Sequence, residues 1–198
     1  IPKNYVKASK YIKEAAEKGN IYGLNNYAEI LKRGHGVKRN ISEAERYYKL
    51  AIEKGNSTTM NNYAKLLQKG DCFAKNTEEA IRLYKMAIDK GSKYAMINYG
   101  MMLQNGEGVP QNFTEAARYY KMAIDKGDAL AMNNYGKMLQ NGLGMPKNPT
   151  EAAHYYKMAI EKGNQNAMKN YAIMLQTGDG IPANAQEASK YYRMSVAK

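Results

Sequence analysis

Apolar residues recur along this chain at the spacing of amphipathic helices. In residues 129–164, Ala131, Met132 and Tyr135 begin a series that places apolar side chains on one helical face. A second apolar series runs through residues 152–160, again at helical spacing. The pattern therefore predicts two helices in this segment, termed here helix A and helix B.

Glycine, proline and asparagine mark the ends of both helices. Helix A is expected to end at Gly142, because a glycine just past the last apolar position supplies the left-handed C-cap. Helix B is expected to begin at the N-cap Asn148, with Glu151 completing a capping box in which each side chain satisfies an orphan backbone amide. Gly163 then ends helix B.

The two-helix unit repeats every 36 residues without an insertion. The glycine that ends helix B recurs at Gly19, Gly55, Gly91, Gly127 and Gly163. A fixed period of this size indicates stacked repeats, each of which buries its apolar face against its neighbours. We therefore expect an all-α fold, a right-handed α-solenoid with eleven helices. Helix B stands alone at about 4–18, and five A/B pairs begin near residues 21, 57, 93, 129 and 165.

The whole chain, residues 1–198, is expected to form a single array. It would consist of a half repeat at 1–19 and pairs at 20–55, 56–91, 92–127, 128–163 and 164–198. Neither end carries the distinctive polar face of a terminal repeat, so we expect an excerpt of a longer array.

The repeated motif reads Ala131-x3-Tyr135-Gly136-x-Met138-Leu139-x2-Gly142-x-Gly144-Met145-x2-Asn148-x3-Ala152-x2-Tyr155-Tyr156-x2-Ala159. This motif resembles the Sel1-like repeat, which is related to the tetratricopeptide repeat. The tetratricopeptide repeat has a shorter period and lacks the Gly-x-Gly loop, which makes it the second interpretation. The resemblance implies an adaptor or scaffold. Cys72 departs from the pattern at the second loop glycine: it is strained if that position needs a positive φ, and otherwise that glycine is dispensable.

The net charge of +12 suggests nucleic-acid binding, but its distribution argues against a specific site. Much of the excess positive charge comes from one lysine per repeat at the end of helix B, where a cation complements the helix dipole. Arginine, which forms the forks that read base edges and phosphates, is much rarer than lysine. The lysines in question are Lys54, Lys90, Lys126 and Lys162.

Candidate catalytic chemistry is sparse. His35 and His154 lie at non-equivalent positions of different repeats, and Cys72 has no histidine in its own repeat. We therefore expect no enzyme activity, no cofactor, no metal and no small-molecule substrate. No apolar run approaches the roughly 20 residues of a membrane span. A cytoplasmic location is expected, with the endoplasmic reticulum lumen or secretion left open.

The candidate site is a groove along the helices A. Helical geometry predicts that residues 133, 134, 137, 140 and 141 face away from the core, and amides with lysines at these positions suit a neutral or acidic peptide. The alternative is that the amides satisfy groups between adjacent repeats. The predicted groove residues are Asn26, Asn62, Asn98, Asn134, Asn170, Asn61, Asn133, Lys65, Lys137, Gln68, Gln104, Gln140 and Gln176.

The expected function is a non-catalytic scaffold that binds a partner protein or peptide, alone or as part of a larger complex. Three alternatives remain at this stage. The chain could be a structural block packed laterally in an assembly, a regulatory array attached to an enzyme domain such as a kinase-like one, or a basic binder of nucleic acid.

Overall fold

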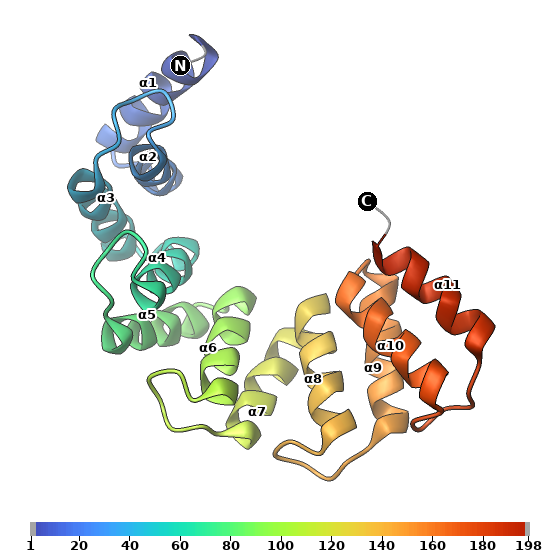
Figure 1. Ribbon diagram of the computed structural model, residues 1–198. Coiled ribbons are helices and arrows are strands. Elements are labelled where there is room, and N and C mark those ends of the chain that lie inside the picture. The colour runs from blue at the N-terminus through green and yellow to red at the C-terminus, as the bar shows by residue number, and fades with distance from the viewer. Residues whose placement is uncertain (1–2, 197–198) are drawn as a thin grey trace. The chain divides into compact units, whose positions relative to one another are not determined.

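The computed structural model describes residues 3–196, and over that part of the chain it contains eleven α-helices and no strand (Figure 1). The predicted number of helices is therefore confirmed, and each helix A begins at the residue that the repeat period predicts. The helices A are α2 (Ile21–Arg33), α4 (Ser57–Lys69), α6 (Lys93–Asn105), α8 (Ala129–Asn141) and α10 (Gln165–Thr177). The helices B are α1 (Lys3–Glu17), α3 (Ile41–Glu53), α5 (Thr77–Asp89), α7 (Phe113–Ile124), α9 (Pro149–Glu161) and α11 (Ala185–Val196).

The helices group into two compact units, one of residues up to 95 and one of residues from 96 onward. In the first unit α1 to α5 pack in chain order, each against the next, and in the second unit α7 to α11 do the same (Figure 1). Each unit thus shows the stacking by which a repeat covers the apolar face of its neighbour.

Glycines with positive φ end both kinds of helix, as predicted. The glycines after helices B have φ between 72° and 83°, and those after helices A have φ between 70° and 76°. After helix B the chain folds back, because the Asn56 N–H donates to the Ala51 carbonyl at 3.0 Å. This is the Schellman arrangement, in which the last carbonyls of a helix find donors just beyond its end.

Each helix B from α3 onward is capped by an asparagine, but only half of the predicted capping box forms. The side chain of Asn148 accepts from the Glu151 N–H at 3.1 Å. The Asn148 N–H does not use the Glu151 side chain and donates instead to the Leu139 carbonyl of helix A at 2.8 Å. The same bond joins Asn40 to Leu31, Asn76 to Leu67, Asn112 to Leu103 and Asn184 to Leu175. The prediction that the glutamate side chain accepts from the N-cap N–H is therefore wrong. The N–H of the capping asparagine donates to the leucine carbonyl of the paired helix A instead.

In two of the pairs a tyrosine of helix B packs against a glycine of helix A. Tyr120 and Tyr156 are fully buried. A Cβ added to Gly136 would lie 2.9 Å from the Tyr156 ring, and Gly100 has the same relation to Tyr120. Glycine at these positions lets the two helices approach closely enough to bury the ring.

The loop between α4 and α5 differs from the others at Cys72. In another loop Gly144 has a φ of 72°, and a Cβ there would lie 2.6 Å from the Phe113 Cβ of the preceding helix B. Among the described residues no non-glycine has a positive φ, so Cys72 adopts a different backbone. The cysteine avoids strain, and the second loop glycine is dispensable in this repeat.

Candidate partner-binding site

Eleven of the thirteen predicted groove residues occupy one side of the helices A, with different degrees of burial. Lys65 and Lys137 are exposed, as are Asn26 and Gln176 at the two outermost helices A. The half-buried residues are Asn62, Asn98, Asn134, Asn170, Gln68, Gln104 and Gln140. These eleven residues are called the helix A row below.

Asn61 and Asn133 do not belong to this row, and the prediction that they face away from the core is wrong. Their exposed fractions are 7% and 3%. Both positions border the apolar stripe of helix A. Asn133 accepts a hydrogen bond from the Asn170 side chain at 2.8 Å, which joins α8 to α10. In the first unit Thr59 donates to Asn25 at 2.9 Å and joins α4 to α2 in the same way.

The glutamines of the row hold the hydroxyl groups of the buried tyrosines. Tyr120 donates to Gln104 Oε1 at 2.9 Å, and Tyr156 donates to Gln140 Oε1 at 2.9 Å. Burial raises the pKa of the Tyr120 hydroxyl, against a smaller opposing effect of the hydrogen bond from Asn134. The carbonyl oxygens of these amides therefore have a structural task, while each Nε2 is left to donate elsewhere.

The first helix A replaces this arrangement with a carboxylate. Tyr48 donates to Glu29 Oε1 at 2.5 Å, and Glu29 Oε2 lies 2.8 Å from Lys32 Nζ and 3.3 Å from Arg33 Nε. Burial alone would raise the pKa of the Glu29 carboxyl. The hydrogen bonds from Lys32 and Tyr48, with the positive charges of Lys32 and Arg33, hold this pKa below its usual value.

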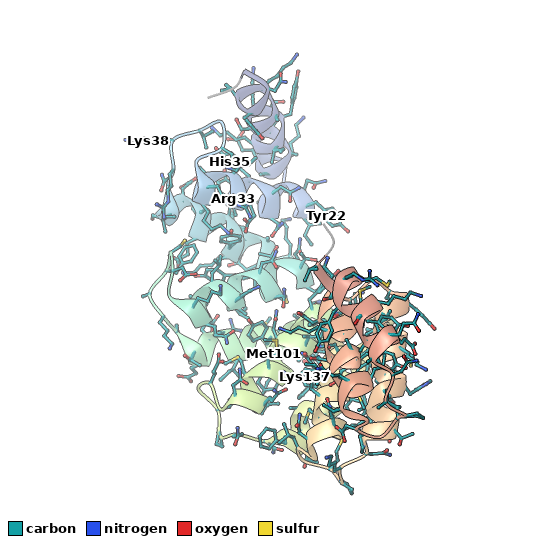
Figure 2. The ribbon with its side chains drawn as sticks, turned by 45° about the vertical axis from the view of Figure 1, so that its right-hand side comes forward. Tyr22, Arg33, His35, Lys38, Met101 and Lys137 are labelled. Atoms are coloured by element: carbon teal, nitrogen blue, oxygen red, sulfur yellow. The ribbon has the colours of Figure 1, made fainter. Side chains whose placement is uncertain are left out.

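Exposed apolar side chains accompany the row, and sequence reasoning missed them. Tyr22 is 71% exposed and Met101 is 40% exposed, and Figure 2 shows Met101 beside Lys137. Met101 and Lys137 both line a hollow of about 150 Å³ in the second unit. The signal was available, because Met101 and Ile173 occupy the helix A position that holds Lys65 or Lys137 in other repeats.

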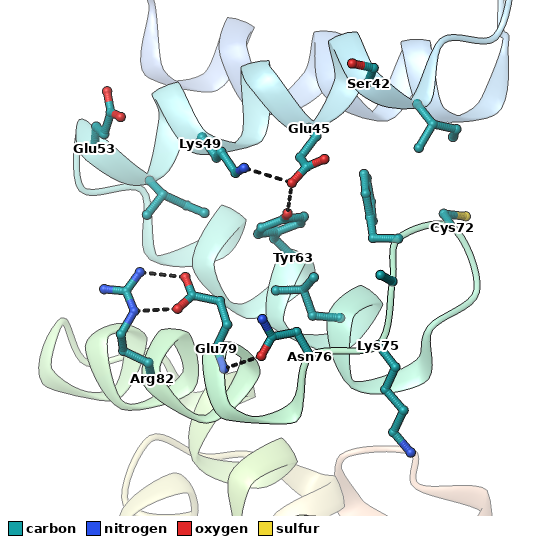
Figure 3. A pocket seen from close by; sticks show the side chains of 15 residues that line it. Ser42, Glu45, Lys49, Glu53, Tyr63, Cys72, Lys75, Asn76, Glu79 and Arg82 are labelled. Carbon is teal, nitrogen blue, oxygen red and sulfur yellow. Dashed lines mark hydrogen bonds and ion pairs between the residues drawn. The ribbon is translucent and has the colours of Figure 1, made fainter.

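A larger groove of about 720 Å³ lies in the first unit beside the loop that contains Cys72 (Figure 3). Glu45 Oε1 lies 2.8 Å from Lys49 Nζ and accepts from the Tyr63 hydroxyl at 2.9 Å. The hydrogen bond from Lys49 keeps the pKa of the Glu45 carboxyl below its usual value. Arg82 donates to both oxygens of Glu79 in the same groove. The central charges are thus paired with one another.

The two histidines, which were the remaining candidates for catalysis, lie far from each other in the sequence and in different repeats. His35 is 5.7 Å from the Tyr5 ring and His154 is 5.8 Å from the Tyr155 ring, measured between centroids, and both histidines are exposed. Within residues 3–196 no three His, Cys, Asp or Glu side chains gather as a metal site would require. None of the described helices has both the length and the apolar character that crossing a bilayer demands.

Helices A and B that alternate at a 36-residue period define a helical-repeat solenoid protein. The chain belongs to the Sel1 repeat family, whose model matches residues 1–20, 21–56, 57–92, 93–128, 129–164 and 165–198. Sel1 repeat proteins are generally protein–protein interaction scaffolds and are typically non-catalytic. None of the curated protein sequences matches the chain.

Solved structures show the same fold. A Sel1 repeat protein from Oxalobacter formigenes is 29% identical, with a TM-score of 0.85 over 96% of this chain and 80% of that chain. The protein c5321, a protective antigen of uropathogenic Escherichia coli, is 25% identical with a TM-score of 0.85, and the match covers 98% of this chain and 42% of that one. The immunity protein Pa5087 from Pseudomonas aeruginosa is 15% identical with a TM-score of 0.63 over 97% of this chain and 74% of that one, a likeness of fold alone.

Proposed function

We propose that this chain is a non-catalytic scaffold that binds acidic segments of a partner protein along the helix A row of each compact unit. The observation that carries the proposal is the separation of charge between the two kinds of helix. In the described residues of α2, α4, α6, α8 and α10 the one acid is Glu29, and Lys32 with Arg33 neutralises it. The basic residues of these helices are Lys32, Arg33, Lys65, Lys69, Lys93, Lys137 and Lys169.

The helices B carry both signs of charge, and several of their charges are paired internally. Arg46 lies 2.6 Å from Glu43, and Arg118 lies 2.5 Å from Glu115. Of the two kinds of helix, the helices A therefore carry most of the net positive charge, which favours an approaching acidic segment and repels a basic one.

The amides of the row complement an extended peptide, because an amide both donates and accepts hydrogen bonds. Each such bond adds only about 0.5–1.5 kcal/mol net, and a micromolar complex needs about 8 kcal/mol. The contacts must therefore be spread over several repeats. Exposed apolar side chains such as Met101 add the area that amides lack.

A binding titration tests this proposal. A fluorescein-labelled peptide of alternating Asp, Glu and Gly is compared with its Asn/Gln counterpart by fluorescence anisotropy at roughly 0.15 M salt. We expect the acidic peptide to bind, and Lys65→Glu or Lys137→Glu to weaken binding by about three- to tenfold each. Lys190→Glu on α11 is the matched control and is expected to change affinity less than about twofold.

Two outcomes would contradict the proposal. Equal binding of the acidic and the neutral peptide would remove the role of charge. Tighter binding of a DNA duplex than of the acidic peptide at the same salt concentration would favour a nucleic-acid function instead.

A further inference from the structure

The hollow beside Met101 is a place where one acidic side chain fits. It lies in the second unit between α6, α7 and α8 and has a volume of about 150 Å³, room for a few water molecules or a side-chain carboxylate. Its lining residues are Met101, Gln104, Asn105, Tyr120, Asn134 and Lys137. Acidic groups are absent from this lining, and Lys137 contributes a positive charge.

The neighbouring repeat shows how a glutamine of the row binds a carboxylate. Gln140 accepts from Tyr156 with Oε1 and donates from Nε2 to Asp179 Oδ2 at 3.0 Å. Asp179 lies in the loop after α10, 39 residues further along the chain, and its other oxygen is 3.6 Å from Lys147 Nζ. The chain therefore supplies its own acid to Gln140.

Gln104 has the same arrangement without the acid. Its Oε1 accepts from Tyr120 at 2.9 Å, and its backbone carbonyl accepts from Gln111 at 2.8 Å. The residue 39 positions further along is Leu143, which cannot accept a hydrogen bond through its side chain. Asn105 is already engaged, since its Nδ2 donates to Glu107 at 2.8 Å. In the described chain Gln104 Nε2 thus keeps its donor capacity, and Gln104 lines the open hollow.

We propose that this hollow binds the carboxylate of an aspartate or glutamate of the partner protein. Gln104 Nε2 donates to the carboxylate as Gln140 donates to Asp179, and the Lys137 ammonium group lies at the same hollow to pair with its charge. Met101 contacts the methylene groups of the bound side chain. This inference rests on the proposed function and assigns one contact within it.

The test introduces, by substitution within this chain, the carboxylate that Gln104 lacks. Leu143→Asp places a carboxylate where the next repeat has Asp179, so it competes with the partner for Gln104. We expect the side-chain amide resonance of Gln104 to shift in the free protein, and the affinity for the acidic peptide to fall by about fivefold or more. Leu143→Asn, of similar size but uncharged, and Gln186→Asp on α11, which adds the same charge elsewhere, are expected to change affinity less than about twofold.

Nuclear magnetic resonance separates the possible failures. If the acidic peptide binds, but the Gln104 amide does not respond and Leu143→Asp has no larger effect than Gln186→Asp, the hollow is not the site and the proposed function stands. If the acidic peptide does not bind the unmodified chain, both proposals are wrong. A response of Gln104 to the acidic peptide, absent with the Asn/Gln peptide, supports the assignment.

Discussion

Single residues at equivalent positions of the repeats perform different tasks according to what surrounds them. Gln104 and Gln140 both hold a buried tyrosine hydroxyl, but only Gln140 also holds a carboxylate. Gly144 and Cys72 occupy the same loop position, but only Gly144 has a positive φ. Repetition of the sequence therefore does not make the sites identical.

The loop position yields a prediction about stability. Gly144→Ala should lower the free energy of unfolding by about 1–3 kcal/mol, because alanine at a φ of 72° is strained and its Cβ would meet Phe113. Cys72→Ala at the equivalent position should change it by less than about 0.5 kcal/mol, since that backbone already accommodates a Cβ. Urea unfolding followed by circular dichroism measures both. Equal losses for the two variants would show that the loops share one conformation.

Whole helices begin and end at residues that act locally. The asparagine before each helix B accepts from the amide three residues later at 2.9–3.1 Å in all five complete repeats. The i,i+3 ion pairs such as Arg82 with Glu79 lie on the helix surface and stabilise it only weakly. The cap is therefore the stronger local determinant of where helix B starts.

Replacement of a cap tests this ranking. Asn148→Ala should destabilise the protein by about 0.5–2 kcal/mol, because the Glu151 amide loses its acceptor. Asn148→Asp keeps an acceptor and should retain most of the stability. The free energies of unfolding in urea provide the measurement. A loss for Asn148→Asp as large as for Asn148→Ala would mean that the amide side chain contributes by packing or by donating and not as a cap.

Across the molecule, carboxyl groups with lowered pKa values are embedded in a chain of net charge +12. Hydrogen bonds from arginine hold the pKa of Glu43, Glu79 and Glu115 below the usual value, and Lys49 does the same for Glu45. Ionised carboxylates thus stabilise the folded state by pairing with the prevailing positive charge.

This distribution predicts acid sensitivity. A carboxyl with a lowered pKa in the folded state stabilises fully above the pKa of the unfolded chain, about 4.5, and loses this contribution as the pH falls through the folded value. The melting temperature should be nearly constant from about pH 7 to 5 and fall below about pH 4.5. Differential scanning calorimetry is the measurement.

Glu29→Gln serves as the matched variant for the acid prediction. It should melt below the unmodified protein at neutral pH, because Gln lacks the charge that pairs with Lys32 and Arg33. The difference should shrink as the pH falls below about 4.5, when Glu29 itself becomes protonated. A difference that stays constant down to about pH 3 would exclude ionisation of Glu29 as its source.

The amino-acid sequence by itself determined the helices and the period of this protein. Helical spacing of apolar residues, asparagine caps and glycines at helix ends are interactions between residues close in the chain, so they are readable without a neighbouring repeat. That is why the eleven helices, the capping asparagines and the terminal glycines agree with expectation. The sequence also predicted which polar residues of the helices A lie away from the core, except for Asn61 and Asn133.

Only the tertiary structure decided what happens at that edge and between repeats. Asn61 and Asn133 border the apolar stripe, and the next repeat determines whether such a position is covered. The backbone N–H of the N-cap residue of helix B donates to a leucine carbonyl of helix A. Only the packing of helix B against helix A brings that oxygen within hydrogen-bonding distance. Gln140 binds Asp179, whereas Leu143 occupies the equivalent position relative to Gln104, and no local pattern encodes this relation between residues 39 positions apart.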